Sequence, residues 1–116
     1  TFDNVKWAVK NLNLEQLVCQ LPEGYDTIIQ SQGKQFSKST VAKILIARAI
    51  VDKPRLLLLE NSFSVFAPHE KQVILSFLLD REHLWTLILS SSEDLPKSPH
   101  FDKKIILEQG KIIQKN

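Results

Sequence analysis

The chain has 116 residues, the size of one domain, and its 43% hydrophobic and 24% charged residues predict a packed core and exclude wholesale disorder. A formal net charge of +2 is too balanced for a nucleic-acid-binding footprint, so we expect no nucleic-acid partner. A single cysteine, Cys19, excludes an internal disulfide, and the longest uninterrupted leucine run, Leu56–Leu59, is far too short to span a bilayer.

Helices are predicted in the first part of the chain. With Asp3 as the N-cap, apolar residues recur at the helical period, at Val5, Ala8, Val9 and Leu12. A second short helix follows, with its apolar stripe at Leu14, Leu17, Val18 and Leu21. Ser37 is a good N-cap for a third helix that runs to about Val51. Its apolar residues wrap widely around the helix, so we expect it to be largely buried.

The second part of the chain alternates strand and helix. The run Leu56–Leu59 does not alternate with polar residues, which favours a parallel strand buried on both faces. Pro68 begins the next helix, whose inner side we expect at Val73, Phe77 and Leu78, and residues 85–89 form the next strand. Two strand-like runs at 104–107 and 111–113, joined by a turn at 108–110, form a hairpin.

This order predicts an α/β fold with a parallel sheet. Two parallel strands and a hairpin are too few to cover a buried strand, because such a strand needs neighbours on both edges and helices on both faces. We therefore expect the chain, which begins at Thr1 rather than Met, to be part of a larger domain. We also expect it to self-associate through its exposed strand edges.

Two places offer chemistry. Glu60 follows the buried strand, where α/β folds place reactive groups, and its carboxylate is suited to Mg²⁺; alternatively, it only meets solvent as the strand leaves the core. The helix after Ser37 offers free N–H groups and a positive dipole end to a phosphate, with Lys38 adding charge; alternatively, Ser37 is only a cap and Lys38 only solvated. No G-x-x-x-x-G-K-[ST] loop exists, so we expect no tight ATP binding by the chain itself.

The order of segments resembles the ATPase domain of exporter-type ABC transporters. Residues 21–27, LPEGYDT, resemble the segment that precedes the family's signature motif, and residues 46–50, IARAI, resemble the helix that follows it. Residues 53–59 resemble the lead into Walker B, and residues 104–112 resemble the closing hairpin. The resemblance implies a partial P-loop NTPase-like fold, with a helical signature subdomain over 1–52 and the second half of the ATPase core over 53–116.

The resemblance also implies roles for particular residues, but at most of these positions the sequence differs from the family's motif. The signature LSGGQ is replaced by residues 36–40, FSKST, so the family implies a nucleotide contact at Ser37, Lys38, Ser39 and Thr40, but both glycines are lost. Lys38 and Ser39 carry side chains that should obstruct the approach of backbone N–H groups to the γ-phosphate.

The residues at the catalytic positions that the family implies also differ from the family's motifs. The Walker B pair becomes Glu60 and Asn61: Glu60 keeps a metal-binding carboxylate, whereas the Asn61 amide cannot act as the general base for water. The switch histidine falls at Ser91, and residues 64–67, SVFA, lack the aspartate of the D-loop.

The family therefore implies ATP and Mg²⁺ as cofactors, a second nucleotide-binding domain in a head-to-tail dimer, and the transmembrane domain of an exporter as partners. We expect a soluble piece of a membrane protein that works at the cytoplasmic face, with little or no ATP hydrolysis. Two alternatives stay open at this point: an active ATPase half with unusual motifs, and a stand-alone, non-catalytic interaction module.

Overall fold

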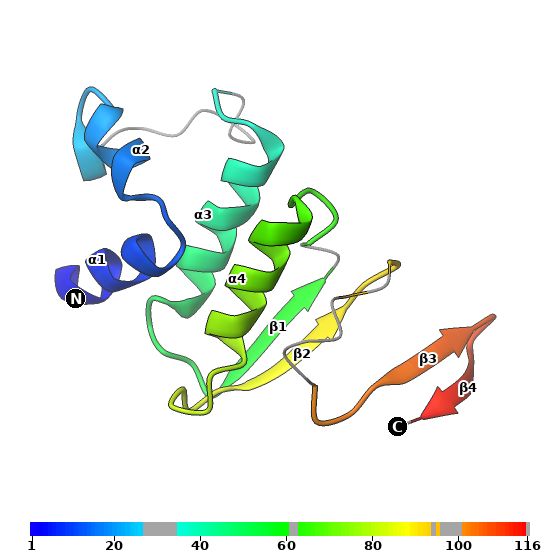
Figure 1. Cartoon of the computed structure of the whole chain (residues 1–116). Coiled ribbons are helices and arrows are strands. Elements are labelled where there is room, and N and C mark those ends of the chain that lie inside the picture. Colours follow the sequence, from blue (N-terminus) through cyan, green and yellow to red (C-terminus); the bar gives the residue numbers. More distant parts are fainter. Residues whose placement is uncertain (27–34, 61–62, 94, 96–100, 116) are drawn as a thin grey trace.

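Helices lead the chain and strands end it, in the order that the periodicity predicts (Figure 1). The computed structural model describes residues 1–26, 35–60, 63–93, 95 and 101–115, so Asn61 lies outside the described residues. The elements are α1 (Phe2–Asn11), α2 (Glu15–Gln20), the single 3-10 turn η1 (Gly24–Asp26), α3 (Lys38–Ile50), β1 (Leu56–Glu60), α4 (Pro68–Leu78), β2 (Thr86–Ser90), β3 (Ile105–Glu108) and β4 (Lys111–Lys115).

Caps explain where the helices begin. The Ser37 side chain accepts a hydrogen bond from the Thr40 N–H at the start of α3, as predicted, and Pro68 occupies the first turn of α4, where its missing N–H costs nothing. The cap of α1 was predicted wrongly. Thr1 accepts the hydrogen bond from the Asn4 N–H, and Asp3 lies inside the first turn, where its negative charge faces the helix dipole favourably.

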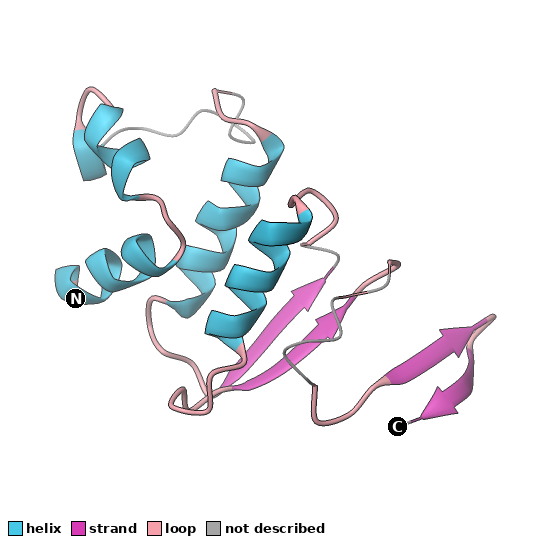
Figure 2. Cartoon of the chain, viewed as in Figure 1, coloured by secondary structure: helices cyan, strands magenta, loops and turns pink. Residues whose placement is uncertain are grey.

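The parallel sheet is confirmed. β1 and β2 pair in parallel with Leu57 opposite Leu87 and Leu58 opposite Ile88, and α4 makes the crossover between them. Figure 2 shows α3 and α4 on the same side of these two strands. The core therefore lies between these two helices and one face of the sheet, and α1 adds to it on the other side of α3 with buried residues such as Ala8 and Val9.

The expected burial of β1 on both faces is wrong. Leu57 is 2% exposed and faces the helices, whereas Leu56 and Leu58, on the opposite face, are 53% and 62% exposed. Among the described residues, nothing covers this second face, because α3 and α4 both pack on the first. We call the exposed set Leu56, Leu58 and Ile88 the outer face of the sheet.

Helix burial is also narrower than expected. In α3 only Ile46 and Ile50 are buried, and Leu45 is about half exposed, because one side of the helix contacts the core. In α4 the buried residues are Ile74, Leu75 and Leu78, whereas Val73, predicted on the inner side, is 38% exposed. The lone Cys19 lies exposed on α2.

The C-terminal hairpin is confirmed and extends away from the helices (Figure 1). β3 and β4 pair antiparallel, with a register shift between Ile106 and Leu107. The turn residues Gln109 and Gly110 have φ angles of 51° and 78°, the pair of positive values that a two-residue type I′ turn requires.

Candidate functional site

The carboxyl ends of β1 and β2 meet at one edge of the parallel sheet. Glu60, the last residue of β1, is in register with Ser90, the last residue of β2, and Ser91 follows directly. In α/β folds this edge is where ligands bind. The structure thus brings the predicted metal residue Glu60 and the predicted switch residue Ser91 to the same edge, while Asn61, next in sequence, lies outside the described residues.

Ser91 is held in a local turn. Its hydroxyl donates to the Glu93 carbonyl oxygen at 2.9 Å and accepts from the Glu93 N–H at 3.1 Å. The Glu93 carboxylate in turn lies 3.4 Å from the Lys71 ammonium group of α4. The segment after β2 is therefore attached to the helix that precedes the strand.

Two buried phenylalanines hold the segment that follows β1. Phe63 and Phe66 lie in the core with their ring centroids 5.5 Å apart, edge to face, and the Phe66 N–H donates to the Phe63 carbonyl oxygen. No sequence pattern above pointed to this pair. Its signal was present, however, in two aromatic residues three positions apart within an otherwise mostly small and polar stretch.

The α3 amino terminus gathers hydroxyl groups. Besides capping the helix, the Ser37 hydroxyl lies 2.9 Å from the Thr40 hydroxyl and 3.3 Å from that of Ser39, and Lys38 is exposed. In Figure 1 the beginning of α3 lies apart from the tips of β1 and β2. The predicted nucleotide-contacting residues and the predicted catalytic edge are therefore two separate places on this chain.

An ion pair joins α3 to α4 between these two places. The Lys43 ammonium group lies 2.6 Å from the Glu70 carboxylate. The hydrogen bond from Lys43 lowers the pKa of Glu70 below its ordinary value. The two helices are thus connected by charge as well as by apolar packing.

The residues present do not by themselves fit a nucleotide or a metal ion. The sequence holds no glycine-rich loop for phosphates, and the edge contributes the Glu60 carboxylate beside serine hydroxyls. No group of three or more acidic, histidine or cysteine side chains that could hold a metal ion occurs within the described parts of the chain. Mg²⁺ needs more oxygen ligands than the described residues of this edge supply.

The fold and the site at the strand ends define the class of protein: the chain is part of a P-loop NTPase-like α/β domain. A solved bacterial Atm1-family ABC exporter with ATP bound superimposes with a TM-score of 0.79 at 25% identity, covering 99% of this chain and 20% of the exporter chain. Among proteins of known sequence, the chain is 32% identical to the ABC multidrug transporter mdr4 of Aspergillus fumigatus and 28% identical to the ABC transporter ATP-binding protein YfiB of Bacillus subtilis.

These matches cover 98% and 97% of the chain, although no family model matches it. The similarity thus runs over nearly the whole chain and is to part of ABC transporter ATP-binding proteins and exporters, which is consistent with a fragment of an ABC nucleotide-binding domain, as the motifs indicated. The chain spans 8% of the length of mdr4 and 21% of that of YfiB. In the described part of the chain, no helix has the length and apolar character needed to cross a membrane.

Proposed function

We propose that this chain supplies the second half of an ABC exporter ATPase domain, and that an upstream half of the same domain covers its outer face. The observation that carries the proposal is the difference in exposure between the two faces of β1. Leu57 is buried, while Leu56 and Leu58 of β1 and their neighbour Ile88 of β2 expose more than half of their surface, although the residues of β1 are typical of a strand buried on both faces.

The dimensions of the chain support the same proposal. Its radius of gyration is 15.4 Å, whereas a compact domain of this length has about 13 Å. The β3–β4 hairpin carries exposed apolar side chains, Ile105, Leu107, Ile112 and Ile113, without packing on the core. An upstream half would supply the strands and helices that these surfaces need.

The two places described above suit two different neighbours. Within the proposed division, 1–52 forms the helical signature subdomain and 53–116 the second half of the ATPase core. The α3 amino terminus, Ser37–Thr40, would face a nucleotide held by an opposite ATPase domain in a head-to-tail dimer, and Glu60 would face the nucleotide of its own domain. The helical subdomain would contact the transmembrane domain of the exporter, at the cytoplasmic face of the membrane.

The proposed half-site is impaired in ATP hydrolysis. The Asn61 amide cannot accept a proton from water, and the loss of a general base lowers rates by about two to four orders of magnitude. The Ser91 hydroxyl, already bonded to Glu93, is a poor replacement for an imidazole. The role that we infer is therefore binding and pairing within a transporter, with little turnover at this chain's own catalytic edge.

An ATPase assay on the longest natural polypeptide that contains these residues tests the proposal. We expect turnover near background in the native protein and a rise of at least about tenfold in the double variant Asn61→Glu, Ser91→His, which restores a base and an imidazole. Gln16→Glu, at an exposed position of α2, adds a carboxylate away from the edge and serves as the matched control. Robust native turnover that survives Glu60→Gln would contradict both the impairment and the assignment of the edge.

A further inference from the structure

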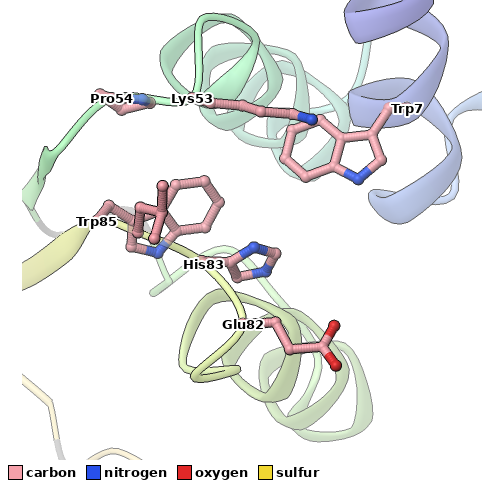
Figure 3. A pocket seen from close by; sticks show the side chains of 7 residues that line it. Trp7, Lys53, Pro54, Glu82, His83 and Trp85 are labelled. Atoms are coloured by element: carbon pink, nitrogen blue, oxygen red, sulfur yellow. The ribbon is translucent and has the colours of Figure 1, made fainter.

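A cleft of about 330 Å³ opens at the amino ends of β1 and β2, the edge opposite to Glu60 and Ser91 (Figure 3). Trp7 of α1 contributes one wall, together with Lys53 and Pro54 from the turn before β1. His83 and Trp85, from the segment before β2, contribute the other. Three parts of the chain that are far apart in sequence therefore meet around one hollow.

Hydrogen bonds to the end of α4 hold the lower wall in place. The Trp85 Nε1–H donates to the Leu78 carbonyl oxygen at 2.9 Å, and the His83 Nε2 lies 2.8 Å from the Phe77 carbonyl oxygen, to which it donates. The His83 and Trp85 rings stack with centroids 4.2 Å apart and an interplanar angle of 25°. The aromatic surface is thus preformed, so a ligand would not have to order it.

Lys53 places a positive charge in the cleft. Its ammonium group lies 4.8 Å from the centroid of the Trp7 ring, and its backbone has a φ of 48°, a left-handed value that is rare for a residue before proline. Its N–H donates to the Ile50 carbonyl oxygen at 2.8 Å, which fixes the turn. In Figure 3 the Lys53 side chain extends across the upper wall, whereas the Glu82 carboxylate projects away from the space between the tryptophans.

We propose that this cleft binds a planar aromatic carboxylate. The ring would pack against Trp7 and Trp85, and the carboxylate would pair with the Lys53 ammonium group. The volume lies at the lower end of the range for small-molecule sites, which suits a ligand of one or two fused rings. Because the carboxylate of Glu82 points out of the cleft, an anion is favoured over a cation.

The chain offers a direct readout, because Trp7 and Trp85 are its only tryptophans. With the full chain labelled with ¹⁵N, the two indole N–H signals report the cleft, and Trp7→Phe assigns them. The probe is 2-naphthoate, compared with its uncharged amide and with 2-naphthylmethylammonium. We expect saturable shifts of both indole signals by 2-naphthoate, at a concentration about two- to fivefold lower than for either analogue, since an exposed ion pair contributes up to about fivefold in affinity.

Charge variants test the role of Lys53. Lys53→Gln keeps most of the side-chain stem and should weaken 2-naphthoate about fivefold, Lys53→Arg should restore binding, and Glu82→Gln, the matched control, should leave it equal or tighter. The proposal would be overturned by any of three outcomes. These are equal affinity for 2-naphthoate and its amide, equal affinity of the native chain and Lys53→Gln for 2-naphthoate, and indole signals that do not shift. Because Lys53 and Glu82 are both exposed, these substitutions leave the core intact.

Discussion

The two faces of β1 can be compared by the same truncation at adjacent residues. Leu57 and Leu58 point to opposite sides of the sheet and are 2% and 62% exposed. Leu57→Ala therefore measures the helix-covered face, and Leu58→Ala measures the outer face. If an upstream half covers the outer face, the cost of the second truncation depends on the length of polypeptide in which it is made, whereas the cost of the first does not.

The magnitudes follow from burial. Leu57→Ala removes a fully buried side chain and should cost about 2–5 kcal/mol of unfolding free energy. Burying a leucine completely contributes about 1.5–3 kcal/mol, and Leu58 is little more than a third buried, so Leu58→Ala should cost about 0.5–1 kcal/mol in this chain. In the longer natural polypeptide, where the outer face would be covered, the same change should cost about 2–4 kcal/mol.

Urea unfolding followed by tryptophan fluorescence measures both changes, because Trp7 and Trp85 pack against the core. The native sequence and the two variants are unfolded in each polypeptide, and Leu57→Ala serves as the internal reference for an interior site. A Leu58→Ala cost that stays below about 1 kcal/mol in the longer polypeptide would show that the outer face meets solvent there, and the proposal of an upstream cover would fail.

Three further predictions follow from contacts described above. Ser37→Ala should cost about 1 kcal/mol by urea unfolding because it removes the N-cap of α3, whereas Ser37→Asp should cost little; equal losses in the two variants would show that the cap contributes nothing. Because Lys43 lowers the pKa of Glu70 in the folded chain, this pair stabilises the fold above the ordinary value of 4.5, and its contribution is lost as the pH falls through the lowered pKa. Glu70→Gln should therefore cost about 0.5 kcal/mol at pH 7, since a third of the side chain meets solvent, and progressively less as the pH falls below 4.5; a cost independent of pH would contradict this account. Light scattering of the chain should give a mass above that of one copy, rising with concentration, because apolar surface and strand edges are open; a single-chain mass with a cooperative melt would refute the expected self-association.

Local patterns predicted the elements well. The N-cap at Ser37, the proline that begins α4 and the hairpin turn are each encoded within a few residues, so the sequence alone locates them, although the predicted turn at 108–110 included Glu108, which is the last residue of β3. Burial was predicted less well, because it depends on what lies opposite. Leu58 is a residue typical of buried strands, yet no element in the described part of the chain packs on it.

In the candidate site, too, some features could be predicted from local sequence and others could not. The position of Glu60 at the carboxyl end of β1 was predictable because it ends an apolar run typical of a parallel strand, whereas its role at that edge stays a prediction. Its neighbour Ser91 required the family resemblance, since a serine after a strand carries little information by itself. The cleft between Trp7 and Trp85 could not be predicted, because it is made by tertiary contacts between segments whose sequences contain no shared pattern.

The type I′ turn of the C-terminal hairpin sets an order of assembly. A hairpin nucleated by its own turn closes in about 1–10 μs, whereas β1 and β2 can pair only after the intervening α4 has folded back over them. Two strands alone are barely stable in water. The β3–β4 hairpin would therefore form early and reversibly. It would make and break its inter-strand hydrogen bonds repeatedly until it packs against a larger surface.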